Sequence, residues 1–119
     1  MPEQALRIVQ ITDAHKQVLE PQWLAAAERV HRQLRPQLPA DYADKMRRVF
    51  RDGGEMCLAV RNEWVVGVAV FREFENTHIG RRFYVDDLVT DESERSTGAG
   101  RALIEYLGLL NHQHPPLTT

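Results

Sequence analysis

The residues best suited to chemistry lie between positions 86 and 101, where five carboxylates, including the adjacent pair Asp86 and Asp87, occur together with two arginines and a glycine pair. Gly98 and Gly100 precede a run of apolar residues spaced as on a helix. Because glycine has no Cβ, a ligand can approach the backbone closely at both positions. The first amides of a helix have no partner within the helix and, together with the helix dipole, bind anions such as a diphosphate. The sequence therefore predicts an anion site at the start of this helix, with an arginine on each side adding positive charge.

Two well-known phosphate-binding motifs do not fit this spacing. A Walker A loop needs Gly-Lys-Ser/Thr after four intervening residues, and the chain has no such run. A dinucleotide fingerprint needs a third glycine where Leu103 stands. A glycine pair alone is also compatible with a plain helix start that binds nothing, so the interpretation depends on the elements around it.

The two carboxylates, Asp86 and Asp87, are adjacent in the strand expected before the glycine pair. A carboxylate at such a position is a candidate for a general base that accepts a proton from a substrate. Adjacent strand residues point to opposite faces of a sheet, and we therefore expect at most one of the two to face a substrate cleft. Both are also compatible with solvated side chains or with carboxylates that hold a neighbouring arginine.

The hydrophobic pattern predicts the elements that position these residues. Strands are predicted at 6–11, 56–60, 64–74 and 82–90, and helices between 13 and 35 and at 42–51 and 98–110. Thr12 or Asp13 is expected to cap the first helical region, and Pro21 to break it in two. The order β-α-α-β-β-β-α indicates an α+β fold with a mostly antiparallel central sheet.

Side-chain positions follow from the same periodicities. Along the last strand, alternation places Phe83, Val85 and Val89 on one face and Tyr84 and Leu88 on the other. The buried stripe of the last helix is expected to consist of Leu103, Ile104, Leu107 and Leu110. Trp23 and Trp64 are expected in the core.

The composition limits the class of protein. The 119 residues fit one domain, and the hydrophobic fraction of 43% with a charged fraction of 27% is that of a globular chain. The net charge of −2 does not favour binding to nucleic acid or to an anionic membrane, and no apolar run approaches the roughly 18 residues of a membrane span. Cys57 is the only cysteine and no secretory signal is visible, so a cytoplasmic location is expected. No residue cluster indicates a metal site.

The stretch Arg95-x-x-Gly98-x-Gly100, between Asp87–Leu88–Val89–Thr90 and Arg101–Ala102–Leu103, resembles the acetyl-CoA motif of the GNAT superfamily of N-acyltransferases. The order of the predicted elements is also similar to that of the family, and the resemblance covers residues 1–111. It implies that acetyl-CoA is the co-substrate and that an acetyl group is transferred to a primary amine of an acceptor that the sequence does not identify.

The resemblance also implies which residues bind the cofactor. The backbone of Leu88, Val89 and Thr90 would pair with the pantetheine arm as an added strand does, and an amide of Leu88 or Val89 would contact the thioester carbonyl. The diphosphate would lie against a second set of residues, namely Arg95, Ser96, Thr97, Gly98, Ala99, Gly100 and Arg101.

The pattern departs from the family after the last helix. The family normally adds a fifth strand, a helix with a tyrosine that can protonate the leaving thiolate, and closing strands, whereas residues 112–119 are expected to form a flexible tail. Without a fifth strand the last strand is an exposed edge, so we expect self-association into a homo-oligomer. Two alternatives stay open: a non-catalytic CoA-binding or self-associating remnant of an acetyltransferase, and a small interaction module that uses the strand edge.

Overall fold

A computed structural model of the chain describes residues 5–78, 80–94 and 97–113. In chain order its elements are β1 (Leu6–Gln10), α1 (Pro21–Leu34), α2 (Tyr42–Arg51), β2 (Gly54–Arg61), β3 (Trp64–Asn76), β4 (Gly80–Thr90), the short 3-10 helix η1 (Glu92–Glu94) and α3 (Ala99–Gln113). The four strands form one sheet in the order β1-β2-β3-β4, and all neighbours are antiparallel. The predicted α+β class and the order of elements are confirmed.

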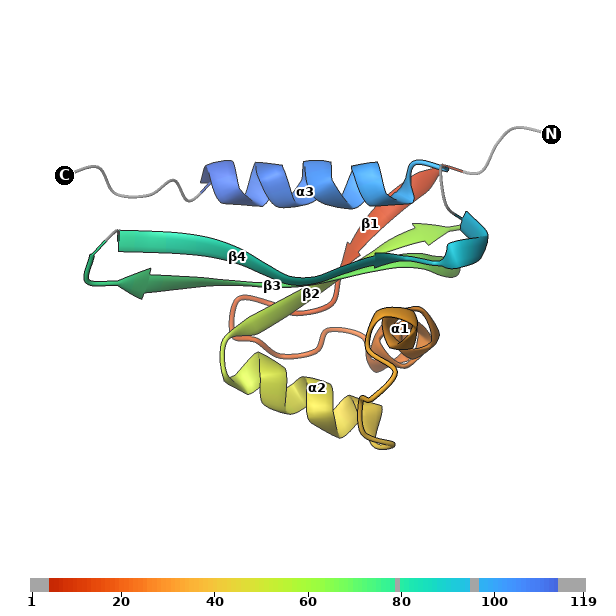
Figure 1. Ribbon diagram of the computed structural model, residues 1–119, viewed down its shortest axis with the longest axis horizontal. Helices are drawn as coiled ribbons and strands as arrows, with labels where there is room; N and C mark the ends of the chain where they lie inside the picture. The colour runs from red at the N-terminus through yellow and green to blue at the C-terminus, as the bar shows by residue number, and fades with distance from the viewer. Residues whose placement is uncertain (1–4, 79, 95–96, 114–119) are drawn as a thin grey trace.

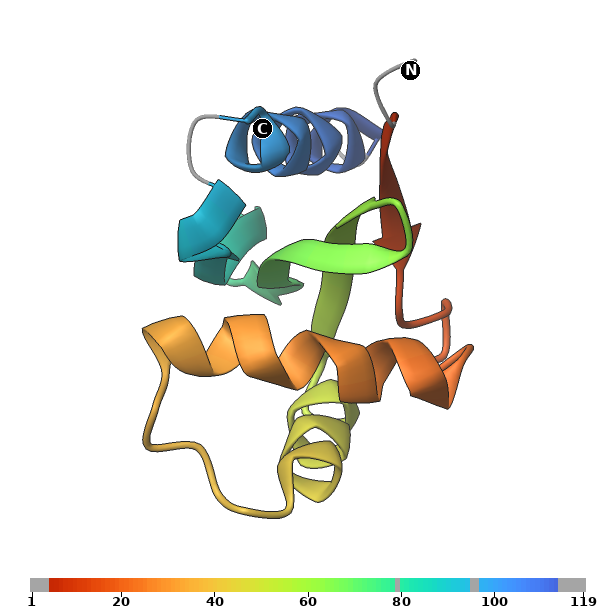
Figure 2. The same ribbon diagram turned by 90° about the vertical axis from the view of Figure 1, so that its right-hand side faces the viewer.

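The sheet is covered by helices on both faces, with α1 and α2 on one side and α3 on the other (Figures 1 and 2). A larger core lies under α1 and α2 and includes Leu24, Met46 and Phe50. A smaller core lies under α3 and includes Phe71 and Leu103. Each face of the sheet therefore contributes its own apolar layer, as expected for a sheet packed on both sides.

The helix α3 approaches the sheet closely at Gly67 of β3. A Cβ at Gly67 would lie 2.9 Å from Cδ1 of Leu103 and 3.3 Å from Cβ of Ala59, so a larger residue there would require the Leu103 side chain to shift. Leu103 and Leu107 are buried as predicted, and Leu110 packs against the same core. Ile104 was expected in this stripe, but its side chain is 58% exposed because it lies on the outer side of the helix.

The segment between β1 and α1 differs from the sequence-based expectation. Residues 11–20 form no helix, and Pro21 is the first residue of α1, where it fits because its missing N–H needs no partner. Neither Thr12 nor Asp13 caps a helix. Thr12 forms an isolated bridge with Val18, and Oδ1 of Asp13 accepts hydrogen bonds from the backbone amides of His15 and Gln17. The Asp13 side chain therefore stabilises a turn by hydrogen bonds to the backbone, and it does not cap a helix as predicted.

The strand β4 contains a β-bulge at Asp86. Its pairing with β3 runs from Val70 opposite Asp87 directly to Phe71 opposite Val85, so Asp86 is an extra residue. In such a bulge two successive side chains lie on the same side of the sheet. The prediction that Asp86 and Asp87 point to opposite faces is therefore wrong, and both line one cavity on the α1–α2 side.

The bulge also inverts the faces of the residues that follow it. Phe83 packs under α3 as part of the smaller core, but Val89 packs with the larger core on the opposite face. Leu88 lies opposite Ala69, a residue of the smaller core. The predicted faces of Val89 and Leu88 are therefore exchanged, because simple alternation does not continue through an inserted residue.

The strand β4 is also an edge of the sheet within the residues that the structure describes, since it is paired with β3 alone. Large apolar side chains are exposed along it, with Tyr84 at 56% and Leu88 at 37% exposure. The helix α3 continues to Gln113, beyond its predicted end at residue 110 and into the predicted tail 112–119, of which positions 114–119 lie outside the described residues. Among the helices of the described chain, none is long and apolar enough to cross a membrane.

Candidate functional site

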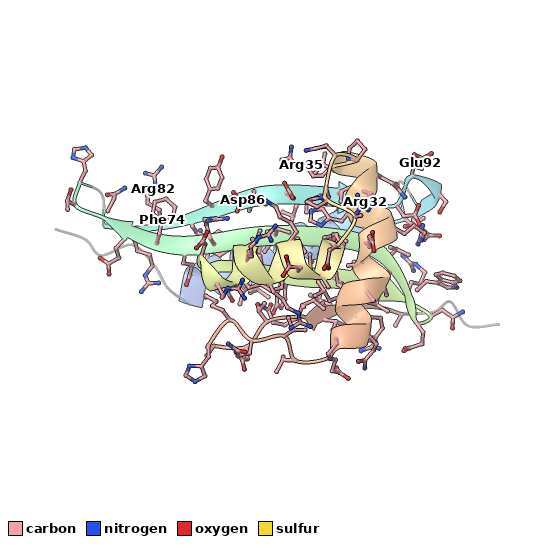
Figure 3. All side chains as sticks on the ribbon, turned by 90° about the horizontal axis from the view of Figure 1, so that it is seen from below. Arg32, Arg35, Phe74, Arg82, Asp86 and Glu92 are labelled. Atoms are coloured by element: carbon pink, nitrogen blue, oxygen red, sulfur yellow. The ribbon has the colours of Figure 1, made fainter. Side chains whose placement is uncertain are left out.

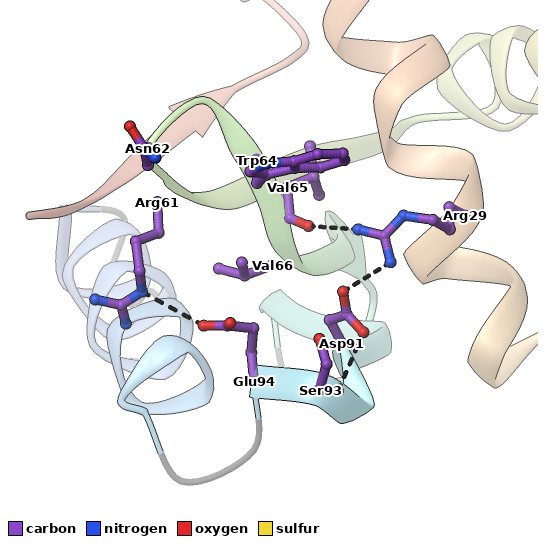
Figure 4. A pocket seen from close by; sticks show the side chains of 9 residues that line it. All are labelled: Arg29, Arg61, Asn62, Trp64, Val65, Val66, Asp91, Ser93 and Glu94. Carbon is purple, nitrogen blue, oxygen red and sulfur yellow. Dashed lines mark hydrogen bonds and ion pairs between the residues drawn. The ribbon is translucent and has the colours of Figure 1, made fainter. Parts of the chain in front are cut away.

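The connection between β4 and α3 begins at Asp91, which is fixed by contacts with α1. Oδ2 of Asp91 accepts a hydrogen bond from Arg29 at 2.7 Å, and Oδ1 accepts from the side chain of Gln33 and from the amide of Ser93, each at 3.2 Å. Figure 4 shows the Arg29 and Ser93 side chains around Asp91. Asp91 is 6% exposed, so its carboxylate is shielded from bulk water, although the Arg29 side chain is half-exposed. The start of the connection is therefore held rigidly against α1.

These contacts change the acidity of Asp91. Burial raises its pKa, but the hydrogen bonds from Arg29, Gln33 and the Ser93 amide lower it more, and the pKa falls from 3.8 to about 2. A group whose pKa is lowered in the folded state stabilises the fold above its unfolded pKa and loses that effect as the pH falls toward the folded value. Asp91 consequently contributes to stability fully above about pH 4 and progressively less between pH 4 and pH 2.

We expect Asp91→Asn to lower the free energy of unfolding by about 1–2 kcal/mol at pH 7, because the charge-assisted bond to Arg29 is lost. At pH 2.5 the difference between the variant and the original chain should be smaller, since the carboxylate is then partly protonated. Urea denaturation at both pH values measures this. Asp44→Asn is the control, because it removes the same charge from an exposed i,i+4 pair with Arg48 and should cost at most about 0.5 kcal/mol. An equal loss for Asp91→Asn at both pH values would contradict the assignment.

The glycine pair lies where the connection enters α3. Gly98 has a φ of +98°, a conformation that favours glycine, and a Cβ placed there would meet no atom within 4 Å. A Cβ at Gly100 would lie 3.3 Å from Cγ2 of Thr90, which brings the helix start close to the end of β4. The first hydrogen bond of the helix runs from the amide of Ala102 to the carbonyl of Gly98, so the amides of residues 99–101 precede it. The amides of residues 99–101 therefore have no partner within the helix.

The structure describes all of the other predicted cofactor-binding residues except Arg95 and Ser96. Leu88, Val89 and Thr90 end β4, next to the turn, and their unpaired edge offers alternate backbone N–H and C=O groups. Thr97 is exposed in the connection, and Ala99 is buried as the first residue of α3. Arg101 is exposed in the first turn of α3. Arg95 and Ser96 lie outside the described residues.

A cavity of about 350 Å³ lies beside the bulge, between β4, β3, α1 and α2. Its polar lining consists of His31, Arg35, Lys45, Arg72, Tyr84, Asp86 and Asp87. Figure 3 shows Asp86 and Arg35 on this side of the sheet, close to α1 and α2. The bulge has thus placed both predicted carboxylates in one cavity with three cationic side chains, next to the free edge of β4.

Asp87 is held by His31 of α1 and by Arg35, the residue that directly follows α1. Its Oδ2 lies 2.7 Å from Nε2 of His31, and its Oδ1 accepts a hydrogen bond from Nε of Arg35 at 2.9 Å. Nδ1 of His31 lies 2.7 Å from the hydroxyl of Tyr42. Burial raises the pKa of Tyr42, so the phenol keeps its proton and can donate to Nδ1 while Nε2 donates to Asp87. This direction satisfies every group of the chain Tyr42–His31–Asp87.

The two carboxylates differ in their surroundings. Burial raises the pKa of Asp87, but the hydrogen bonds from Arg35 and His31 outweigh it and hold the pKa below 3.8. Asp86 accepts a hydrogen bond from Nε of Arg72 at 2.8 Å. Each carboxylate thus binds an arginine, which is the alternative role that the sequence analysis left open for both. The lowered pKa of Asp87 makes it a weak base.

Sequence reasoning did not single out His31, although a signal exists. His31 continues the apolar stripe of α1, following the buried residues Leu24 and Ala27 at helical spacing, and it is 1% exposed. A histidine in such a position needs partners for both ring nitrogens, and the structure supplies them from α2 and β4.

A larger cavity, of about 650 Å³, lies at the end of the β2–β3 hairpin, beside the connection to α3 (Figure 4). Trp64 lines it with 66% of its surface exposed, so the prediction that Trp64 lies in the core is wrong. The guanidinium of Arg29 lies 5.7 Å from the centre of the Trp64 ring.

Cys57 is fully buried, and this burial raises the pKa of its thiol to about 12. Within the described residues no three histidine, cysteine or acidic side chains are grouped to hold a metal ion.

Several solved structures with the same fold are acetyltransferases. An acetyltransferase of Trypanosoma brucei is 22% identical, with a TM-score of 0.69 over 92% of this chain and 76% of its own. Aminoglycoside N-acetyltransferase AAC(6')-Iy in complex with CoA is 14% identical, with a TM-score of 0.75 over 94% of this chain and 72% of its own. The ribosomal-protein-alanine N-acetyltransferase of Brucella melitensis is 20% identical, with a TM-score of 0.64 over 92% and 73% of the two chains.

A search of curated proteins finds no significant match. A comparison of the sequence with protein families, in contrast, agrees with the similarity of fold. The family described as Acetyltransferase (GNAT) family matches residues 18–107, a range that includes the α1–α2 cavity, the bulge of β4 and the glycine pair. With the helix start, the free strand edge and the order of elements, this match shows that the chain belongs to the GNAT acetyltransferase family.

Proposed function

We propose that the protein transfers an acetyl group from acetyl-CoA to a primary amine. The observation that carries the proposal is the turn at Gly98, which has a positive φ and open space at its Cβ position and lies between the free edge of β4 and the first amides of α3. A diphosphate fits these amides, and an extended thiol-bearing arm fits the strand edge. Membership of the GNAT acetyltransferase family also supports this proposal.

In the proposed complex the diphosphate lies against residues 97–101, with Arg95 and Ser96 as further candidates, and the pantetheine arm lies along Leu88–Thr90. An amide of Leu88 or Val89 donates to the thioester oxygen, which gains negative charge when the amine attacks. The C–N bond forms, the C–S bond breaks, and the thiolate leaves and takes up a proton. The acceptor amine enters from the cavity beside the bulge.

The carboxylates of that cavity act on the amine nitrogen. The low pKa of Asp87 does not suit it to removing a proton from an alkylammonium before the attack. Once the C–N bond forms, the nitrogen carries a positive charge and is much more acidic. We propose that Asp87, with Asp86 beside it, stabilises this charge and accepts the proton at that stage.

Thermal unfolding with acetyl-CoA, CoA and ADP tests the cofactor site. At a ligand concentration of 100 times Kd, the stabilisation is about 2.7 kcal/mol, which raises the Tm of a small domain by several degrees. Release of free CoA thiol with a panel of primary amines then tests the transfer. Stabilisation by CoA without thiol release would favour the non-catalytic alternative, and no stabilisation by any of the three ligands would contradict the proposal.

A homo-oligomer is the second part of this proposal. Apolar side chains are exposed on β4 and on the outer side of α3, where Ile104 is 58% and Leu109 is 64% exposed. A second copy is the simplest partner able to cover them. The alternative function, a CoA-binding or self-associating remnant, rests on the same surface, and sedimentation of the thermal-unfolding samples reports the state of association.

A further inference from the structure

Arg61, at the end of β2, contacts the connection between β4 and α3. It is the last residue of β2 and precedes the two-residue turn of Asn62 and Glu63, whose φ angles are +52° and +65°. Both values belong to the tight hairpin turn that matches the twist of antiparallel strands. The backbone that carries Arg61 is therefore held firmly by the β2–β3 hairpin.

The side chain of Arg61 contacts both Glu94 and Thr97 in this connection. Its Nη2 donates a hydrogen bond to the carbonyl oxygen of Thr97 at 2.9 Å. Its Nε lies 3.5 Å from Oε1 of Glu94, a contact that Figure 4 shows. Glu94 and Thr97 are joined as well, because the hydroxyl of Thr97 donates to the carbonyl of Glu94 at 2.6 Å. The side chain of Arg61 is 20% exposed and that of Glu94 29%, so bulk water competes only in part.

The bond to Thr97 fixes the direction of the next amide. In a trans peptide the C=O and the following N–H point in opposite directions. Because the carbonyl of Thr97 points to Arg61, the N–H of Gly98 points away from Arg61. Glycine adopts many backbone angles at little cost, so this peptide plane needs an anchor to keep one orientation.

We propose that Arg61 is a positioning residue for CoA, which holds the peptide between Thr97 and Gly98 so that the Gly98 amide faces the diphosphate. This inference rests on the proposed function, because it assigns a role within the proposed CoA site. Arg61 acts through the backbone and needs no contact with the phosphates.

A direct ionic contact between Arg61 and the phosphates is the competing explanation, and Glu94 separates the two. If Arg61 acted only as a positive charge, Glu94→Gln would remove a nearby negative charge and strengthen CoA binding. If Arg61 acts as an anchor, Glu94→Gln removes the ion pair that holds the guanidinium in place and weakens CoA binding. The two explanations therefore predict changes of opposite sign.

The experiment measures Kd for CoA by calorimetry on the full chain and on four variants. We expect Arg61→Gln to weaken binding about tenfold or more, the loss of one charge-assisted hydrogen bond. Glu94→Gln should weaken it several-fold, and Arg61→Lys should restore part of the affinity. Arg7→Gln is the matched control, because it removes the same charge from β1, where Arg7 is exposed and paired with Glu63. Its affinity for CoA should not change.

A readout with acetylpantetheine, which lacks the diphosphate, distinguishes positioning from a general loss of structure. KM for acetylpantetheine should be the same in Arg61→Gln as in the original chain, while KM for acetyl-CoA rises at similar kcat. Tighter CoA binding by Glu94→Gln, or an equal loss for both substrates in Arg61→Gln, would overturn the inference and leave the proposed function intact. If the original chain binds no CoA, the proposed function fails first and the inference with it.

Discussion

Replacing Gly98 by glutamate is expected to weaken CoA binding by at least about a hundredfold, which corresponds to about 2.7 kcal/mol. The Cβ of the new residue would point into the space that is open in the structure, where no atom lies within 4 Å. Under the proposed function the diphosphate occupies that space. A carboxylate there would fill it and repel the phosphates, and like charges brought together in a binding site cost several kcal/mol.

Gly53→Glu is the control for this variant, because Gly53 shares both local features of Gly98. It has a φ of +105°, no atom lies within 4 Å of its Cβ position, and it follows α2, away from the connection to α3. Both variants should lose about 1–2 kcal/mol of stability from the strained backbone. Calorimetric titration with CoA should then show normal affinity for Gly53→Glu and an affinity lower by at least about a hundredfold for Gly98→Glu. Normal affinity in Gly98→Glu would exclude this helix start as the phosphate site.

The parts of the fold that the sequence predicts well are those that depend on neighbouring residues. The helix Tyr42–Arg51 has the predicted limits, because Asp41 accepts a hydrogen bond from the amide of Asp44 and two glycines follow the helix. The glycine at position 98 is found at the expected helix start with a positive φ. These features depend on a few adjacent residues, whose types restrict the backbone directly.

The parts that were predicted wrongly depend on contacts between distant segments. The bulge at Asp86 exists because β3 and β4 pair in a particular register, and β4 itself carries no glycine or proline at that point to indicate it. His31 finds its partners on α2 and β4, 11 and 56 residues away. The candidate cavity therefore became visible only when these segments were brought together, although its carboxylates were already identified as candidates.

The second large effect is expected at Asp87. Asp87→Asn should lower kcat by about a hundredfold or more, the usual loss when one group that stabilises charge in the transition state is removed. Asp86→Asn is the matched comparison, because it removes the same charge from the same cavity but leaves the contacts with His31 and Arg35 in place. We expect a smaller loss for Asp86→Asn, whose partner is Arg72 on the neighbouring strand. Kd for CoA should be unchanged in both variants, which shows that each is folded.

The pH dependence of the rate distinguishes the role proposed for Asp87 from that of an ordinary general base. Because hydrogen bonds from Arg35 and His31 hold the pKa of Asp87 below 3.8, it is already ionised across the neutral range. The rate at low acceptor concentration should then follow the neutral form of the amine and rise about tenfold per pH unit below the amine pKa of about 10.4. Asp87→Asn should keep this slope and lower the whole profile. An acid limb between pH 5 and 7 that disappears in Asp87→Asn would mean instead that substrate binding raises the pKa of Asp87, and the carboxylate would then act as the base that deprotonates the acceptor.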